Sequence, residues 1–286
     1  MTTPQLTNNP SFVPGLENQI TLCEERLMSS GSLHQQTGLI EIDDVRIAIA
    51  SLVGGQESNR DSIYCYRPAS PSRLSWVVAI ADGVSRSFAS KLGSSLACVA
   101  SIEHLIADQS TELPIDPVSH ASNLFRDIGE RLLEMPDQGK PSDVSSSLWS
   151  HCVQEGRLFQ TTLMVLWQSD DEIHLCGVGD GGFAVDYDAN RTPMIFIPRF
   201  DGNVDCLGAM TGITKSRFYH RFNDCDRICL FTDGLSPAIL SDYVAALKLW
   251  RQIPVDGERN EALRVLKLSE RTGEVDDNIS IAMVSR

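Results

Sequence analysis

Several features that mark particular classes of protein are missing from this sequence. The eight cysteines include no Cys-x-x-Cys pair, and several of them (Cys98, Cys176, Cys229) lie inside apolar runs, as reduced core thiols of a cytosolic protein do. No stretch is long and apolar enough to span a membrane, and the first forty residues lack the basic start and the apolar segment of a secretory signal. We therefore expect a soluble, cytoplasmic protein.

Basic residues are also scarce. The chain has 24 Lys and Arg against 38 Asp and Glu, which gives a formal net charge of -14. Nucleic acids and anionic membrane surfaces are bound through basic patches, so this charge balance argues against both as partners. Proteins and small phosphorylated molecules are the partners that remain.

An unbroken apolar run, residues 76–81, is followed by Asp82 and Gly83. Such a run is typical of a strand buried on both faces. Burying an ionised carboxylate at the end of such a strand costs on the order of several kcal/mol, unless a cation or several hydrogen-bond donors compensate its charge. The pattern therefore indicates either a tight turn, for which Asp-Gly is a common dipeptide, or a metal site.

The same pattern recurs along the chain. Apolar strands also run into Gly179-Asp180 and into Asp233-Gly234, while Asp276-Asp277-Asn278 and Asn59-Arg60-Asp61 each precede one. Oxygen ligands at strand ends, without paired His or Cys at metal spacing, suit hard cations such as Mg²⁺ or Mn²⁺. The recurrence favours a metal site over isolated turns.

The order of these motifs, with Thr161-Thr162-Leu163 before the third, resembles the metal-dependent serine/threonine phosphatases of the protein phosphatase 2C type. The resemblance runs from about residue 45 to 284. The segment after Asp82, which lacks the Met-Gly-Gly-His continuation common in that family, is most similar to a prokaryotic branch.

The apolar spacing predicts helices over residues 85–107, 117–135 and 142–159, with strands before and after this block. Separate runs of strands and helices indicate an α+β protein. The resemblance implies more, namely a four-layer αββα sandwich of two antiparallel sheets flanked by helices. We expect a tail or loosely attached arm over residues 1–40, rich in polar residues and Pro, and a catalytic domain over 41–286.

The resemblance assigns roles to six positions in a two-metal centre. Asp82, Asp233 and Asp277 would be the catalytic metal ligands, with Asp82 bridging the ions, Gly83 offering its carbonyl, Asp180 joining Asp233 around a third ion, and Asp61 orienting metal-bound water. The activity implied is hydrolysis of phosphoserine and phosphothreonine in proteins by a metal-activated water. The partners implied are a phosphorylated protein substrate and a cognate kinase, and we expect a monomer.

The chain departs from the family pattern in three places. Arg60 stands where most relatives are acidic, Gln56 where many carry a phosphate-binding Arg, and Val84 where some have a His that could protonate the leaving group. Arg60 or Arg86 would then bind phosphate, and no general acid is identified. The alternative is a phosphatase-like module that binds a phosphoprotein or signalling partner without turnover.

For two further segments the sequence leaves more than one interpretation. Residues 188–226 show no periodicity, which predicts a long irregular stretch. The resemblance implies that this stretch takes the place of the family's flap beside the active site. Its function is then either substrate selection or that of a plain solvated connection, and the sequence favours neither. Thr161 and Thr162 are either core hydroxyls or residues with high β propensity, and we favour β propensity.

Overall fold

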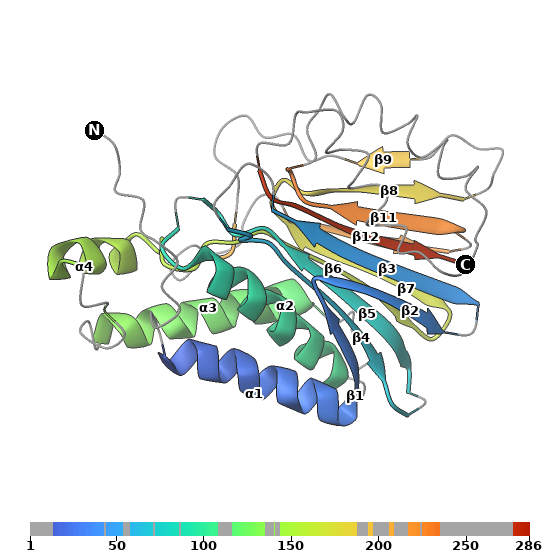
Figure 1. Cartoon of the computed structure of the whole chain (residues 1–286), viewed down its shortest axis with the longest axis horizontal. Helices are drawn as coiled ribbons and strands as arrows, with labels where there is room; N and C mark the ends of the chain where they lie inside the picture. The colour runs from blue at the N-terminus through green and yellow to red at the C-terminus, as the bar shows by residue number, and fades with distance from the viewer. Residues whose placement is uncertain are drawn as a thin grey trace.

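The apolar run at residues 76–81 lies in strand β5 (Leu74–Ala81), an interior strand of a six-stranded antiparallel sheet in the computed structural model (Figure 1). Its side chains alternate between two faces, as in any strand. Val77 and Ala79 pack under helices, whereas Val78 and Ile80 pack toward a second sheet. Because both faces are covered by apolar groups, the run has no polar alternation.

The structure describes residues 14–42, 44–53, 58–70, 72–85, 87–107, 116–134, 140, 144–187, 194–196, 206–208, 217–223, 225–234 and 277–286. The helices are α1 (Pro14–Ser30), α2 (Ser90–Ala107), α3 (Pro117–Glu134) and α4 (Ser146–Gln154). The remaining strands are β1 (Gly31–Gln35), β2 (Thr37–Ile42), β3 (Val45–Leu52), β4 (Ser62–Pro68), β6 (Leu163–Ser169), β7 (Glu172–Val178), β8 (Gly182–Asp186), β9 (Met194–Phe196), β10 (Phe218–Phe222), β11 (Arg227–Phe231) and β12 (Ile279–Ser285).

Two six-stranded antiparallel sheets face each other. The first has the strand order β1, β4, β5, β6, β7, β10, and the second has the order β2, β3, β12, β11, β8, β9. The core between them is built from inward-facing side chains of both sheets, such as Ile63 and Trp76 from the first and Ile47 and Phe183 from the second. This arrangement confirms an α+β sandwich of two antiparallel sheets.

Helices α1, α2 and α3 cover the outer face of the first sheet (Figure 1). The expected helices at 85–107 and 142–159 begin later than the apolar spacing suggested, at Ser90 and Ser146. The sequence also predicts helices over residues 237–250 and 258–268, and both ranges lie outside the described residues. None of the helices in the described part is long and apolar enough to cross a bilayer.

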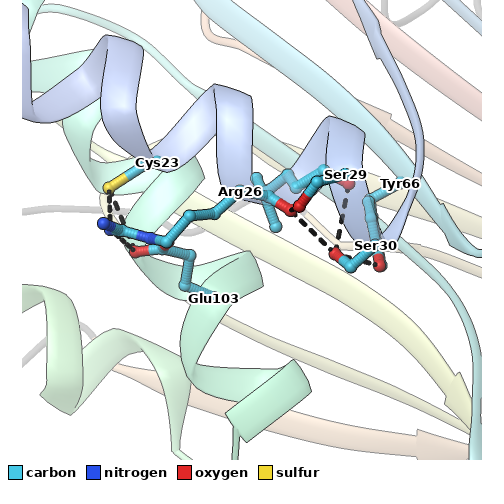
Figure 2. Close-up of polar contacts among 7 residues, drawn as sticks. Cys23, Arg26, Ser29, Ser30, Tyr66 and Glu103 are labelled. Carbon is cyan, nitrogen blue, oxygen red and sulfur yellow. Dashed lines mark hydrogen bonds and ion pairs between the residues drawn. The ribbon is translucent and has the colours of Figure 1, made fainter.

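Part of the segment expected as a tail or arm is integrated into the sandwich. Cys23 and Leu27 of α1 are buried against α2, and the Arg26 guanidinium pairs with Glu103 of α2 at 2.6 Å (Figure 2). The chain then adds one edge strand to each sheet, and Gln36, with φ of 62°, is the single residue between them. The polar composition conceals this packing, because the buried residues of α1 are few and spaced at helical intervals.

Candidate active site

The aspartates of the five motifs come from both sheets. Asp82 follows β5 and Asp180 follows β7 in the first sheet, while Asp233 follows β11 and Asp277 precedes β12 in the second. The carboxyl of Asp82 interacts with those of Asp61 and Asp233, and Asp233 also interacts with Asp180. The structure thus brings acidic groups that are far apart in the sequence to one end of the sandwich.

Asp61 is fully buried, and its environment is polar. Its Oδ2 accepts a hydrogen bond from Thr232 Oγ1 at 2.9 Å, and its backbone N–H donates to Asn59 Oδ1 at 3.0 Å. Its Oδ1 receives no hydrogen bond from the described residues, and the neighbouring Asp82 carboxyl can donate one only when it carries a proton. A buried carboxylate oxygen without a donor is costly, so this atom has capacity for a cation or water.

The backbone of Asp82 is held by two threonines. Thr162 Oγ1 accepts from the Asp82 N–H at 3.0 Å, and the Asp82 carbonyl accepts from Thr161 Oγ1 at 2.7 Å and from the Thr162 N–H at 2.8 Å. Both threonines are buried. The preference for β propensity at these positions is therefore wrong, because the hydroxyls bind the residue at the end of β5.

Leu207 is part of this support and was not among the residues that the sequence analysis singled out. Its backbone pairs with Thr161 through two hydrogen bonds of 2.8 and 3.1 Å, and its side chain is fully buried. The residue lies within the stretch 188–226, between β9 and β10. Only long-range pairing identifies it, since nothing local distinguishes it from its neighbours.

Two glycines allow close backbone approach at the site. A Cβ on Gly83 would lie 2.8 Å from the carbonyl oxygens of Arg60 and Ser90, and one on Gly234 would lie 2.0 Å from the carbonyl oxygen of Asn278. Any side chain at Gly234 would separate the ends of β11 and β12 and with them Asp233 and Asp277.

Burial and mutual repulsion raise the pKa values of these carboxyl groups. Burial, followed by repulsion from Asp82 and Asp180, raises the pKa of Asp233 to about 8, although the residue as a whole stays accessible. Burial is also the first cause for the raised pKa of Asp82, and repulsion from Asp61 adds to it. Burial is also the largest cause of the raised pKa values of Asp61 and Asp180. These groups are therefore held close together against their electrostatic preference.

The chemistry of the donor set fits a hard cation. In the described part of the chain, no three His, Cys, Asp or Glu side chains already surround a common point at the distances of metal ligands. The gathered carboxyl oxygens and the orphaned Asp61 Oδ1 nevertheless provide the oxygen ligands and the negative charge that Mg²⁺ or Mn²⁺ requires. Gly83 and Thr161 form an antiparallel β-bridge. Its two hydrogen bonds join the Asp82 carbonyl to the Thr162 N–H and the Val84 N–H to the Gln160 carbonyl, so the bridge does not use the Gly83 carbonyl.

The remaining expected site residues lie around this cluster. Asn278 Nδ2 donates to the Ser58 carbonyl at 3.2 Å and its N–H to Asp277 Oδ1 at 2.8 Å, so it ties the start of β12 to the first motif. Arg60 Nη1 donates to the Ser85 carbonyl at 3.2 Å, in the loop that follows Asp82. Arg86, Gln56 and Asp276 lie outside the described residues.

Comparison with solved structures shows the same fold at low identity. The serine/threonine phosphatase PstP/Ppp of Mycobacterium tuberculosis is 18% identical, with a TM-score of 0.55 over 84% of this chain and 98% of that one. The catalytic domain of PstP with two manganese ions is 20% identical, with a TM-score of 0.53 over 84% and 97%. RsbX in complex with magnesium is 14% identical, with a TM-score of 0.52 over 87% and 99%.

A search of curated proteins found no match to this chain. The family model described as Protein phosphatase 2C matches residues 52–266, which is well over half of the sequence. The match includes every motif described above except Asp276-Asp277-Asn278, which lies beyond residue 266. With the two-sheet fold, this match shows that the chain belongs to the protein phosphatase 2C family of protein phosphatases.

Proposed function

We propose that the protein is a metal-dependent phosphatase that removes phosphate from phosphoserine and phosphothreonine side chains of proteins. The observation that carries this proposal is the meeting of Asp61, Asp82 and Asp233 at one end of both sheets, with pKa values raised by burial and by one another. Such a cluster is stable as a set of anions only when cations compensate it.

Two Mg²⁺ or Mn²⁺ ions would be held by Asp82, by the Gly83 carbonyl, by Asp233 and by Asp277, and Asp180 with Asp233 would hold a third. When bound, the ions supply Lewis acidity toward phosphate oxygens and an acidified water as nucleophile. The solved PstP domain with two manganese ions and RsbX with magnesium support this choice of ions.

The protein's own residues position the reacting groups. Thr161 and Thr162 fix the backbone of Asp82, and Thr232 fixes the carboxyl of Asp61, which would orient the attacking water from behind the ligands. Because these contacts join residues directly beside the ends of strands in both sheets, we propose that the ligand geometry is set before substrate binds.

Arg60 and Arg86 are the side chains we propose for binding the substrate phosphate in place of the arginine that Gln56 replaces. The hydrogen bond from Arg60 to Ser85 uses one of five N–H donors of its guanidinium and anchors it in the loop beside Asp82. A guanidinium in this place can bind two phosphate oxygens at once.

The proposed activity also leads us to propose a substrate, an opposing enzyme and an oligomeric state. The substrate is a cytoplasmic phosphoprotein, the opposing enzyme is a cognate kinase, and the phosphatase works as a monomer. The strong negative charge of the chain agrees with a protein partner and not a nucleic acid.

Activity assays with purified protein test the proposal. We expect hydrolysis of p-nitrophenyl phosphate and of phosphothreonine peptides that depends on Mn²⁺ or Mg²⁺ and is abolished by EDTA. Calorimetric titration with Mn²⁺ should give tight binding in the same sample. Metal binding without turnover, or no metal binding, would instead favour the phosphopeptide-binding module, which peptide titration would then detect.

A further inference from the structure

A line of polar side chains runs along helix α2 among the apolar residues of its buried face. Lys91, Ser94, Ser95 and Cys98 are spaced at i, i+3, i+4 and i+7, so they share one side of the helix, and we refer to them as the polar stripe. Ser94, Ser95 and Cys98 are buried. Buried hydroxyls in a helix need partners. Ser94 Oγ lies 3.0 Å from the Lys91 carbonyl of its own helix, and it also has partners in the segment before and at the start of β4.

The polar stripe meets three consecutive backbone carbonyls. Ser94 Oγ donates to the Arg60 carbonyl at 2.7 Å, Lys91 Nζ donates to the Asp61 carbonyl, and Cys98 Sγ lies 3.8 Å from the Ser62 carbonyl. Residues 60 and 61 precede β4, so their carbonyls lie outside the ladder that β4 forms with β5. Buried carbonyls require donors, and α2 provides them.

The stripe also encloses the hydroxyl of Ser62, the first residue of β4. Ser62 Oγ lies 2.8 Å from Ser94 Oγ, 2.9 Å from Ser95 Oγ and 3.0 Å from Lys91 Nζ. Lys91 has no carboxylate partner in an ion pair within the described part of the chain, so its donors are directed to this backbone segment.

Asp61 is therefore held from two sides. Its carboxyl is bound by Thr232 of the second sheet, whereas its carbonyl is bound by Lys91 of α2. If the carbonyl were released, the backbone at residues 60–62 would be free to rotate and the carboxyl would shift relative to Asp82.

We infer that the polar stripe of α2 is the positioning element for Asp61, with Lys91 and Ser94 as the positioning residues that fix its backbone. Neither residue contacts the reacting groups in this role. The effect on turnover depends on the proposed function, but the effect on the backbone of residues 58–63 does not.

Two variants and a matched control test this inference. Lys91→Met and Ser94→Ala each remove one donor to the segment, and only the first also removes a charge. Ser101→Ala is the control, because Ser101 is a buried serine on the same helix whose Oγ bonds the Ala97 carbonyl at 2.7 Å and touches none of residues 60–62.

Hydrogen–deuterium exchange at 20 °C should show about tenfold faster exchange in the peptide covering residues 58–63 for both variants and unchanged exchange there for the control. With saturating Mn²⁺, kcat for p-nitrophenyl phosphate should fall about 10- to 100-fold in both variants while KM stays unchanged.

Each other outcome overturns the inference. Unchanged exchange at residues 58–63 shows that the stripe does not hold this segment. A loss of activity in Lys91→Met alone shows a charge effect instead of positioning, and faster exchange with wild-type kcat shows that the position of Asp61 does not matter. If the wild type itself lacks activity, the proposed function fails and the exchange data alone decide the inference.

Discussion

Thr232, directly after β11 in the second sheet, donates a hydrogen bond of 2.9 Å to the carboxyl of Asp61, directly before β4 in the first sheet. Its hydroxyl oxygen in turn accepts from the Ser280 N–H of β12 at 2.9 Å. All three residues are buried. One threonine thus sets the position of a first-sheet carboxyl relative to the second sheet.

Replacing Thr232 by Val should destabilise the protein and impair turnover. The change leaves Asp61 Oδ2 and the Ser280 N–H without this partner at almost constant side-chain volume, which costs about 1–3 kcal/mol of unfolding free energy for each unsatisfied buried group. Urea unfolding at pH 7 measures the stability, and p-nitrophenyl phosphate hydrolysis with Mn²⁺ measures kcat.

Thr232→Ser is the matched control because it keeps the hydroxyl and loses one methyl group, worth about 0.8 kcal/mol. It should retain most of the activity. Equal losses in the two variants would show that packing, and not the hydrogen bond to Asp61, explains the effect.

Asp82→Asn and Asp233→Asn should each lower turnover by orders of magnitude. Each removes an anionic ligand from the proposed centre and so weakens cation binding and the acidification of bound water. Without metal, both variants should unfold at the same temperature as the wild type or at a higher one, because one source of repulsion is gone.

Thermal unfolding with and without Mn²⁺ tests the same pair of variants. Added Mn²⁺ should raise the Tm of the wild type by more than that of either variant, since a ligand stabilises only the state that binds it. Full activity in the variants, or a Tm far below wild type in EDTA, would identify these aspartates as turn and capping residues.

The metal-free protein should lose stability as the pH rises from about 4 to about 8. The pKa of Asp233 is raised from 3.8 to about 8 in the folded state, and the pKa of Asp82 is also raised. Between these pH limits the folded protein binds more protons than the unfolded one, so the stability present at low pH is lost through this window.

Urea unfolding in EDTA at pH 5 and pH 8 measures this loss, and Asp233→Asn should reduce the difference between the two values. Mn²⁺ should also reduce it, because the cation replaces the protons as compensation for the carboxylates. A stability that rises with pH in EDTA would contradict the raised pKa values.

The stretch 188–226 is not irregular throughout as expected, because it contains β9 and β10, the edge strands of the two sheets. Shortening the part of it outside these strands should affect phosphopeptides more than p-nitrophenyl phosphate if this stretch selects protein substrates. The deletion has to spare residues 206–208, because Leu207 pairs with Thr161 and thereby supports Asp82. Equal losses on both substrates would assign the stretch a structural role.

Much of the fold followed from local pattern. The apolar run before Asp82 predicted β5, since a strand buried on both faces needs apolar residues at every position. Helix α3 occupies Pro117–Glu134, close to the expected 117–135, because its apolar residues recur at helical intervals. The α1 helix was missed because its few buried residues lie in a polar sequence.

The sequence by itself determined which residues carry carboxylates at strand ends, since each Asp follows or precedes an apolar run and this is visible locally. Only the tertiary structure decided how they are held. Asp82 depends on Thr161, 79 residues away, and Asp61 on Thr232, 171 residues away. Such contacts depend on strand register and on the distance between the two sheets, which arise from packing of the whole sandwich and leave no local periodicity in the chain.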